Sequence, residues 1–236
     1  GIIWDRMIGW QHTSTGDYSA WTGWNFKRAT GFLDIVAYTG NATSDRDINH
    51  NLGVTPELMI VRARDSSQNW VSYDASTGAT KYMRLNTDAQ PATTSGIWNN
   101  TAPTSSVFTV DGTGGRAEVN ANGTDYIAYL FATVAGVSKV GSYSGTGSNV
   151  DVDCGFSSGA RFILIKRSTD SGGWYLYDSH RGIVAGDDPY TFLNDNANSA
   201  TNTDYIDPLN AGFTVTSSAP VELNTSGHTY IFLAIA

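Results

Sequence analysis

The sequence predicts an all-β protein built from two tandem homologous β-sandwich domains of a jelly-roll, lectin-like type. Two observations lead to this fold class: the composition favours strands joined by polar turns, and a set of residues recurs after 104 or 105 positions. Hydrophobic residues form 40% of the 236 residues, which is enough for a core, while charged residues form only 15%. Gly, Ser, Thr and Asn, which favour turns, account for 92 residues.

An internal repeat organises the chain. The spacing between matching residues drifts by only one position over more than a hundred, which indicates a duplication. We define unit one as residues 31–135 and unit two as residues 136–236. The matching pairs include Tyr38 and Tyr143, Trp70 and Trp174, Asp74 and Asp178, Asn120 and Asn224, and Tyr126 and Tyr230.

Residues 1–30 precede unit one and end as a unit ends, with a phenylalanine five positions before a glycine. One interpretation is that residues 21–26 are the closing strand of an upstream repeat. The alternative is an N-terminal extension whose strand pairs with unit one. Because the chain starts with glycine and stops inside a strand-like run, we also expect it to be a piece of a longer repeat array.

Six short segments of unit one are rich in β-branched and aromatic residues and are bounded by turn residues, as strands are. Six strands in about 104 residues without a helical period indicate a sandwich. The continuous apolar runs 58–61, 126–132 and 162–165 are expected to be covered on both faces, as central strands or at a contact between the units. The predicted strands are residues 34–38, 58–64, 70–73, 81–85, 107–110 and 126–132.

Charge and cysteine content restrict the function classes. A net charge of −8 argues against nucleic-acid binding, which requires a basic surface. Cys154 is the single cysteine, so the sequence excludes an internal disulfide and the usual cysteine-based zinc site. The longest apolar stretch, residues 126–137, is about half of the roughly 20 residues that a membrane span needs. We therefore expect neither a nucleic-acid nor a membrane partner.

The motifs that enzymes use are missing or incomplete. Glycoside hydrolysis needs two facing carboxyl groups, but Glu118 and Glu222 occupy the same position in the two units, which favours a structural role. The run 141–145 carries Tyr143 where a nucleophile elbow needs serine. We therefore expect no enzymatic activity, although chemistry by a pair of aspartates is left open.

Metal and cofactor sites are also weakly indicated. The four histidines lie far apart, with none of the spacings typical of zinc ligands. Residues 45–47 and 187–188 contain paired aspartates in predicted loops, where calcium could find oxygen ligands. The simpler interpretation is that these are solvated loop acids. We expect no cofactor, with calcium as the open alternative.

Tryptophans supply the candidate ligand contacts. Trp70 and Trp174 could stack on sugar rings, but their repetition favours burial of each in the core of its own unit. Trp98 has no counterpart in unit two, so it is the better candidate for a surface contact. We predict a ligand-binding site at Trp98, Asn99 and Asn100.

Several segments of unit one carry a resemblance to a known family. They are residues 32–41, 50–61, 69–71, 98–105 and 126–132. In these segments the chain resembles tandem β-sandwich domains of unknown function in the virion proteins of marine phages and cyanophages. Unit two departs from the pattern, with Cys154-Gly155-Phe156 where unit one has His50-Asn51-Leu52. The resemblance implies a tail-fibre or capsid-associated role and no catalytic residues.

Three classes of function remain: a phage structural or adhesion module, a carbohydrate-binding module of a secreted bacterial protein, and an enzyme. We favour the first, a tail-fibre or capsid-decoration module on the virion surface that acts by assembly and surface binding. Its expected partners are other virion proteins, further copies of the chain and host-surface glycans. Fold alone does not decide between the first two classes.

Overall fold

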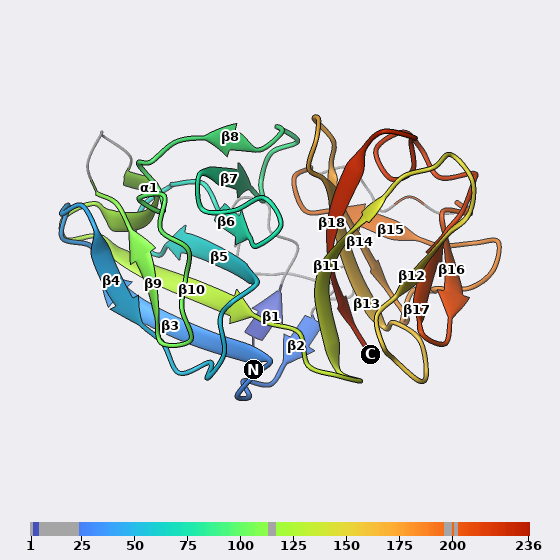
Figure 1. The fold of residues 1–236 in the computed structure, drawn as a ribbon, viewed down its shortest axis with the longest axis horizontal. Helices are drawn as coiled ribbons and strands as arrows, with labels where there is room; N and C mark the ends of the chain where they lie inside the picture. The colour runs from blue at the N-terminus through green and yellow to red at the C-terminus, as the bar shows by residue number, and fades with distance from the viewer. Residues whose placement is uncertain (1, 5–23, 113–116, 196–199, 201–202) are drawn as a thin grey trace, which may run out of the picture.

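The structure is a computed structural model that describes residues 2–4, 24–112, 117–195, 200 and 203–236 (Figure 1). These residues form antiparallel sheets and one four-residue helix, α1 (Ala117–Asn120). The predicted all-β class is therefore confirmed. Among these residues no helix is long and apolar enough to cross a membrane.

Unit one contains a six-stranded sheet, in the order β3-β10-β5-β6-β7-β8, and a two-stranded sheet, β4-β9. All six predicted strands are present, whereas β4 and β8 were not predicted, because three of the four residues of β4 are polar and β8 has only two residues. Arg46 and Asp47, expected in a loop, begin β4. The bounds are β3 Leu33–Thr39, β4 Arg46–Asn49, β5 Leu58–Ala63, β6 Val71–Asp74, β7 Lys81–Arg84, β8 Ala92–Thr93, β9 Val107–Val110 and β10 Asp125–Phe131.

Unit two repeats this topology. Its larger sheet has the order β11-β18-β13-β14-β15, which matches β3-β10-β5-β6-β7, and its smaller sheet has the order β12-β17-β16. The repeat in the sequence is therefore also a repeat in strand order. The bounds are β11 Ser138–Ser144, β12 Val150–Asp153, β13 Phe162–Arg167, β14 Trp174–Asp178, β15 Tyr190–Phe192, β16 Ile206–Leu209, β17 Gly212–Val215 and β18 Thr229–Ile235.

Within each unit the two sheets face each other across a buried apolar cluster, which makes each unit sandwich-like. In unit one Phe108 of the small sheet belongs to the same cluster as Met59 of the large sheet. In unit two Phe213 and Ile163 have the corresponding positions. All four side chains are less than 2% exposed. Burial of such side chains contributes about 1.5–3 kcal/mol each.

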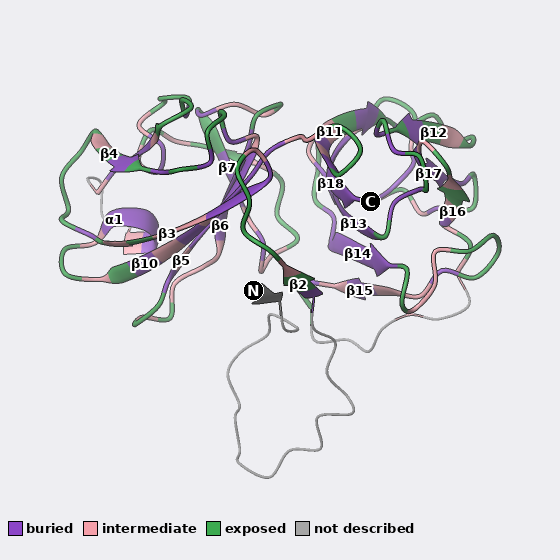
Figure 2. Cartoon of the chain, turned by 90° about the horizontal axis from the view of Figure 1, so that it is seen from below, coloured by how far each residue is buried: buried purple, intermediate pink, exposed green. Residues whose placement is uncertain are grey.

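A third apolar cluster, here called the seam, lies between the two units. It is formed by the outer faces of the two large sheets, where Leu58 and Ile60 of β5 belong to one cluster with Phe162 and Leu164 of β13. These residues occupy the same positions of the repeat. Consequently β13 is buried along its whole length, as is most of β5 (Figure 2). The expectation of cover on both faces is confirmed for residues 58–61 and 162–165, whereas in the run 126–132 Ile127 and Tyr129 are only half-buried.

An N-terminal strand lies across the seam. β2 (Trp24–Phe26) pairs antiparallel with β1 (Ile2–Trp4) rather than with a strand of unit one. The Phe26 ring makes edge-to-face contacts with Phe131 of unit one, at 6.3 Å between centroids, and with Phe162 of unit two, at 5.1 Å. β2 therefore contacts both units. Residues 21–23, the first half of the strand predicted here, lie outside the described residues.

The turn that follows β2 has the same form as the turn that joins the two units. Ala29 forms a bridge with Leu33, and Val134 forms a bridge with Ser138, 105 residues later. Each turn contains a glycine with positive φ, 81° in the first and 72° in the second. Thus the entry into each unit is built alike.

Candidate functional site

The structure places the predicted ligand-binding tryptophan inside unit one. Trp98 is 1% exposed, and its ring lies edge-to-face with Tyr73 at 6.1 Å between centroids. The expected surface position of this indole is therefore wrong, because its ring fills the core of unit one. Asn99 and Asn100 follow with φ of 50° and 54°, and the Asn99 amide donates to Asp45 at 3.0 Å. Asparagine tolerates this backbone conformation well. Ligand binding by this segment stays a prediction.

The repeated tryptophans also differ from expectation, because both belong to the seam and neither to the core of its own unit. Trp174 is 2% exposed, and its Nε1 donates to the carbonyl oxygen of Arg84, in unit one, at 3.0 Å. Trp70 is half-buried at the margin of the seam. Its ring stacks on Tyr129, at 6.4 Å between centroids, and the Arg62 guanidinium lies 5.6 Å from its centre.

In unit one Glu118 forms an ion pair with Arg84. Arg84 donates to both carboxylate oxygens of Glu118, from Nε at 2.7 Å and from Nη2 at 3.1 Å. The Asn69 amide donates to the same carboxylate at 2.6 Å. The Arg84 guanidinium also lies over the ring of Tyr82, 5.1 Å from its centroid. The hydrogen bonds with Glu118 are the main reason that the pKa of Arg84 is raised.

The equivalent glutamate of unit two, Glu222, has different neighbours. Across the paired strands Val71 lies opposite Arg84, and Tyr175 lies opposite Phe192, so Phe192 takes the position of the arginine. The Tyr175 hydroxyl donates to Oε2 of Glu222 at 2.8 Å. Burial and this carboxylate raise the pKa of Tyr175. A tyrosine hydroxyl thus bonds to the unit two glutamate where unit one has a guanidinium.

A second donor to the glutamate is lost as well. Gly173 directly precedes the repeated tryptophan, where unit one has Asn69. A Cβ at Gly173 would lie 2.3 Å from the Phe192 ring, so this ring fills the space of the missing side chain. The Gly173 N–H is 3.5 Å from the Glu222 carboxylate, a long hydrogen bond. Among the described residues no Lys, Arg or His nitrogen lies within 4.0 Å of that carboxylate.

Tyr175, whose hydroxyl bonds to Glu222, belongs to a group of five aromatic rings that we call the aromatic cluster: Tyr175, Tyr177, Tyr190, Phe192 and Tyr205. Successive ring centroids are 4.6 Å (Tyr175 and Phe192), 5.2 Å (Tyr190 and Phe192) and 5.8 Å (Tyr190 and Tyr205) apart. Tyr175 and Tyr177 are buried, whereas the other three rings are half-buried. The cluster and Glu222 together are the candidate site. The sequence gives no signal for it, because only the strand register, and not the repeat spacing, aligns Phe192 with Arg84.

In the acidic segments considered for calcium, carboxylates accept hydrogen bonds from other groups of the protein. The carboxylate of buried Asp188 accepts three backbone N–H groups at 2.9–3.1 Å. Burial raises its pKa to about 6. Asp47 accepts the Thr109 hydroxyl at 2.7 Å. In the ranges that the structure describes, no group of three or more His, Cys, Asp or Glu side chains could hold a metal ion.

Two histidines, His50 and His228, have structural partners for their rings. His50 is buried, and its ring nitrogens lie 3.1 Å from the Thr104 carbonyl oxygen and 3.2 Å from the Leu52 N–H. His228 lies 3.0 Å from the Thr169 hydroxyl. His12 lies outside the described residues.

Fold and site together define a class of protein: an all-β, sandwich-like chain with a repeated strand order, a shared apolar seam and a polar-aromatic cluster in its second unit. The chain belongs to the family described as a domain of unknown function, DUF7483, whose family model matches residues 9–236. That match spans both units. No curated protein and no solved structure matches the chain.

Proposed function

We propose that this protein is a structural and adhesion module of a phage virion, a tail-fibre or capsid-decoration component that acts by assembly and surface binding and not by catalysis. In this proposal residues 31–135 and 136–236 are two tandem homologous sandwich domains of jelly-roll type, preceded by residues 1–30. The module is displayed on the virion surface, where it contacts other virion proteins, further copies of itself and host-surface glycans.

The observation that carries the proposal is the seam. Inter-domain contacts are usually polar and permit relative motion, unless they are large and hydrophobic. Here an apolar cluster joins the two large sheets. The short connection between β10 and β11 is also tied down, because the Ser138 hydroxyl donates to the Ala132 carbonyl oxygen at 2.7 Å. A firmly joined double unit is well suited to a component that must keep its shape within an assembly.

Two further features support the proposal. Exposed turns rich in Asn, Ser, Thr and Gly offer hydrogen-bond donors and acceptors to glycans and to neighbouring subunits. The phage assignment is supported by the resemblance of unit one to domains of marine phage virions. Several copies on one particle would also gain avidity from individually weak contacts.

Immunogold electron microscopy of virions from a phage that encodes the chain tests the proposal. An antibody raised against the folded chain should label the tail or the capsid surface of intact particles. A chain that is absent from purified virions and present in the secreted fraction of a bacterial culture would contradict the virion assignment.

The second candidate function is a carbohydrate-binding module of a secreted bacterial protein. The specific observation in its favour is the half-buried Trp70 ring, stacked on Tyr129 at the margin of the seam. Aromatic rings of this kind offer an apolar platform to a sugar. A glycan array probed with the protein and with Trp70→Ala tests it. Two results together would favour this alternative. The native protein binds a glycan that Trp70→Ala does not bind, and the chain is found only in the secreted fraction of a bacterial culture.

A further inference from the structure

We propose that the Glu222 carboxylate and the half-buried rings of Tyr190, Phe192 and Tyr205 bind an organic cation, a guanidinium or an alkylammonium group. This inference goes beyond the proposed function and does not depend on it. It is based on a comparison within the chain, because the equivalent position of unit one contains a cation that belongs to the protein.

Unit one shows which chemistry suits this position. The Arg84 guanidinium donates to both oxygens of Glu118 and lies over the ring of Tyr82, 5.1 Å from its centroid. A planar guanidinium matches a carboxylate in this two-point geometry and stacks on an aromatic face. The position therefore combines a carboxylate and a ring around one positive group.

Unit two keeps the carboxylate and the ring but not the cation. Glu222 has the position of Glu118, and Tyr190 stands two residues before Phe192 as Tyr82 stands two residues before Arg84. Glu222 is half-buried. Its carboxylate accepts hydrogen bonds from the Tyr175 hydroxyl, at 2.8 Å, and from the Gly173 N–H, at 3.5 Å. A cation from outside can therefore supply the missing charge.

The rings beside Glu222 favour a cation over a neutral ligand. The centroid of the Tyr190 ring lies 5.2 Å from that of Phe192 and 5.8 Å from that of Tyr205. The faces of aromatic rings carry partial negative charge and attract cations, most strongly where water is partly excluded. Half-buried rings next to a carboxylate satisfy this condition.

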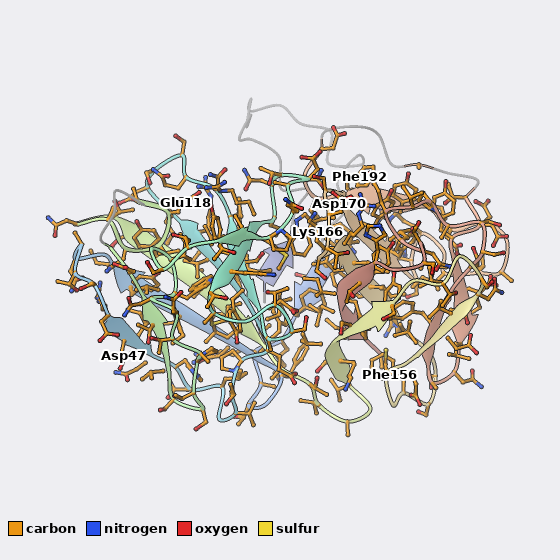
Figure 3. The ribbon with its side chains drawn as sticks, turned by 45° about the horizontal axis from the view of Figure 1, so that its top comes forward. Asp47, Glu118, Phe156, Lys166, Asp170 and Phe192 are labelled. Atoms are coloured by element: carbon orange, nitrogen blue, oxygen red, sulfur yellow. The ribbon has the colours of Figure 1, made fainter. Side chains whose placement is uncertain are left out.

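The neighbouring charges limit the affinity. Lys166 and Arg167 are near Glu222, but their N–H groups donate to main-chain carbonyl oxygens. Asp170 lies 3.8 Å from Arg167 and partly offsets its charge. Figure 3 shows Lys166, Asp170 and Phe192 on the same side of the molecule. The two nearby cations repel a third, so we expect an isolated probe to bind with a Kd of about 1 mM.

Isothermal titration calorimetry on the whole chain tests the proposal with matched probes. Choline and ethylguanidinium are the cationic probes, and 3,3-dimethyl-1-butanol is the neutral isostere of choline. Both cations should bind at least tenfold more tightly than the neutral probe. Glu222→Gln should weaken cation binding at least tenfold. The control Asp170→Asn removes a nearby charge outside the site and should change the affinity by no more than about twofold.

Phe192→Arg supplies a second, independent test. This variant restores the residue that unit one has at this position, so the new guanidinium should pair with Glu222. Binding of both cationic probes should disappear, and the midpoint of thermal unfolding should rise. A peptide Gly-Arg-Gly that binds the native chain tenfold more tightly than ethylguanidinium indicates an arginine of a partner protein. Equal affinities indicate a small-molecule cation.

Three results would overturn the inference. The first is equal affinity for choline and its neutral isostere. The second is cation binding that is unchanged in Glu222→Gln or in Phe192→Arg. The third is no binding of any cationic probe up to about 50 mM. None of these results bears on the presence of the chain in virions, so failure here and failure of the proposed function can be told apart.

Discussion

Several residues that recur in both units satisfy buried polar groups. Asn120 bonds to the main chain of residues 41–43, and Asn224 bonds in the same way to residues 146–148. The hydroxyls of Tyr126 and Tyr230 each accept a backbone N–H and donate to a backbone carbonyl. A buried polar group without partners costs about 1–3 kcal/mol, so such residues are not easily replaced.

Replacement of Asn120 tests the role of this hydrogen-bond centre. Asn120→Ala removes two hydrogen bonds between a fully buried side chain and the main chain of residues 41–43, so we expect a loss of about 1–3 kcal/mol in the free energy of unfolding, measured with urea. The control Asn210→Ala changes an exposed asparagine and should stay within about 0.5 kcal/mol of the native chain. Equal stability of the two variants would show that the Asn120 bonds contribute nothing.

Lys166 makes stability depend on pH. It is fully buried, and burial lowers its pKa to about 8, against about 10.4 in an unfolded chain. Between these values the unfolded state binds more protons, so the free energy of unfolding rises as the pH increases from about 8 to about 10. Above about pH 10 the buried tyrosines, whose pKa is raised, act in the opposite direction.

Lys166→Met removes the charge and keeps an apolar side chain. In this variant the rise in the urea midpoint between pH 8 and pH 10 should disappear, while the exposed control Lys81→Met should keep it. A Lys166→Met variant with the same pH profile as the native chain would mean that another group causes the rise.

At the scale of the element, the ends of the edge strands β3 and β11 depend on one glycine each. A Cβ at Gly40 would lie 1.9 Å from the carbonyl oxygen of Ala121, and a Cβ at Gly145 would lie 2.4 Å from that of Thr225. Real Cβ atoms do not come so close to main-chain atoms. Each strand can therefore approach the equivalent turn of its own unit only because glycine has no side chain.

Alanine at these glycines should displace the turn. We expect Gly40→Ala and Gly145→Ala each to lower the free energy of unfolding by more than about 2 kcal/mol. Gly227→Ala is the matched control, because it has open space around it and its positive φ alone should cost only about 1 kcal/mol. The free energies of unfolding of the three variants are measured by chemical denaturation. If Gly227→Ala lowers the free energy of unfolding as much as the other two, the steric explanation is refuted.

At the scale of the whole molecule, the seam buries the outer faces of the two large sheets in one apolar cluster. Side chains such as Ile60 and Leu164 lie on the outer faces of their sheets, where they would meet water if the units separated. Neither is more than 2% exposed. Large apolar contacts of this kind couple the stabilities of neighbouring repeats. We therefore expect one cooperative unfolding transition for the described chain.

Ile60→Ala tests this coupling. Truncation of a buried isoleucine costs about 2–5 kcal/mol, and the loss should appear as faster hydrogen exchange in β5 and in β13 alike. Val54→Ala, at an exposed position, should leave exchange unchanged. Faster exchange confined to unit one, or two separate melting transitions, would show that the units are stable independently.

The sequence by itself determined the all-β class, the six predicted strands of unit one and the recurrence of residues, because each rests on local patterns or on self-similarity. It did not place Trp98 or Trp70 correctly, since burial of a ring depends on which segment lies opposite it. Only the tertiary structure decided that β5 and β13 share a seam. An apolar run looks the same whether its second face meets a sheet of its own unit or of the next.

The candidate site was beyond sequence reasoning for the same physical reason. Tyr190, Tyr205 and Glu222 come from three separate segments, and no spacing along the chain shows that they meet. The loss of the arginine at the position of Phe192 acquires meaning only once the strand register aligns it with Arg84. Local patterns determine elements, whereas contacts between distant side chains determine sites, and only folding brings those side chains together.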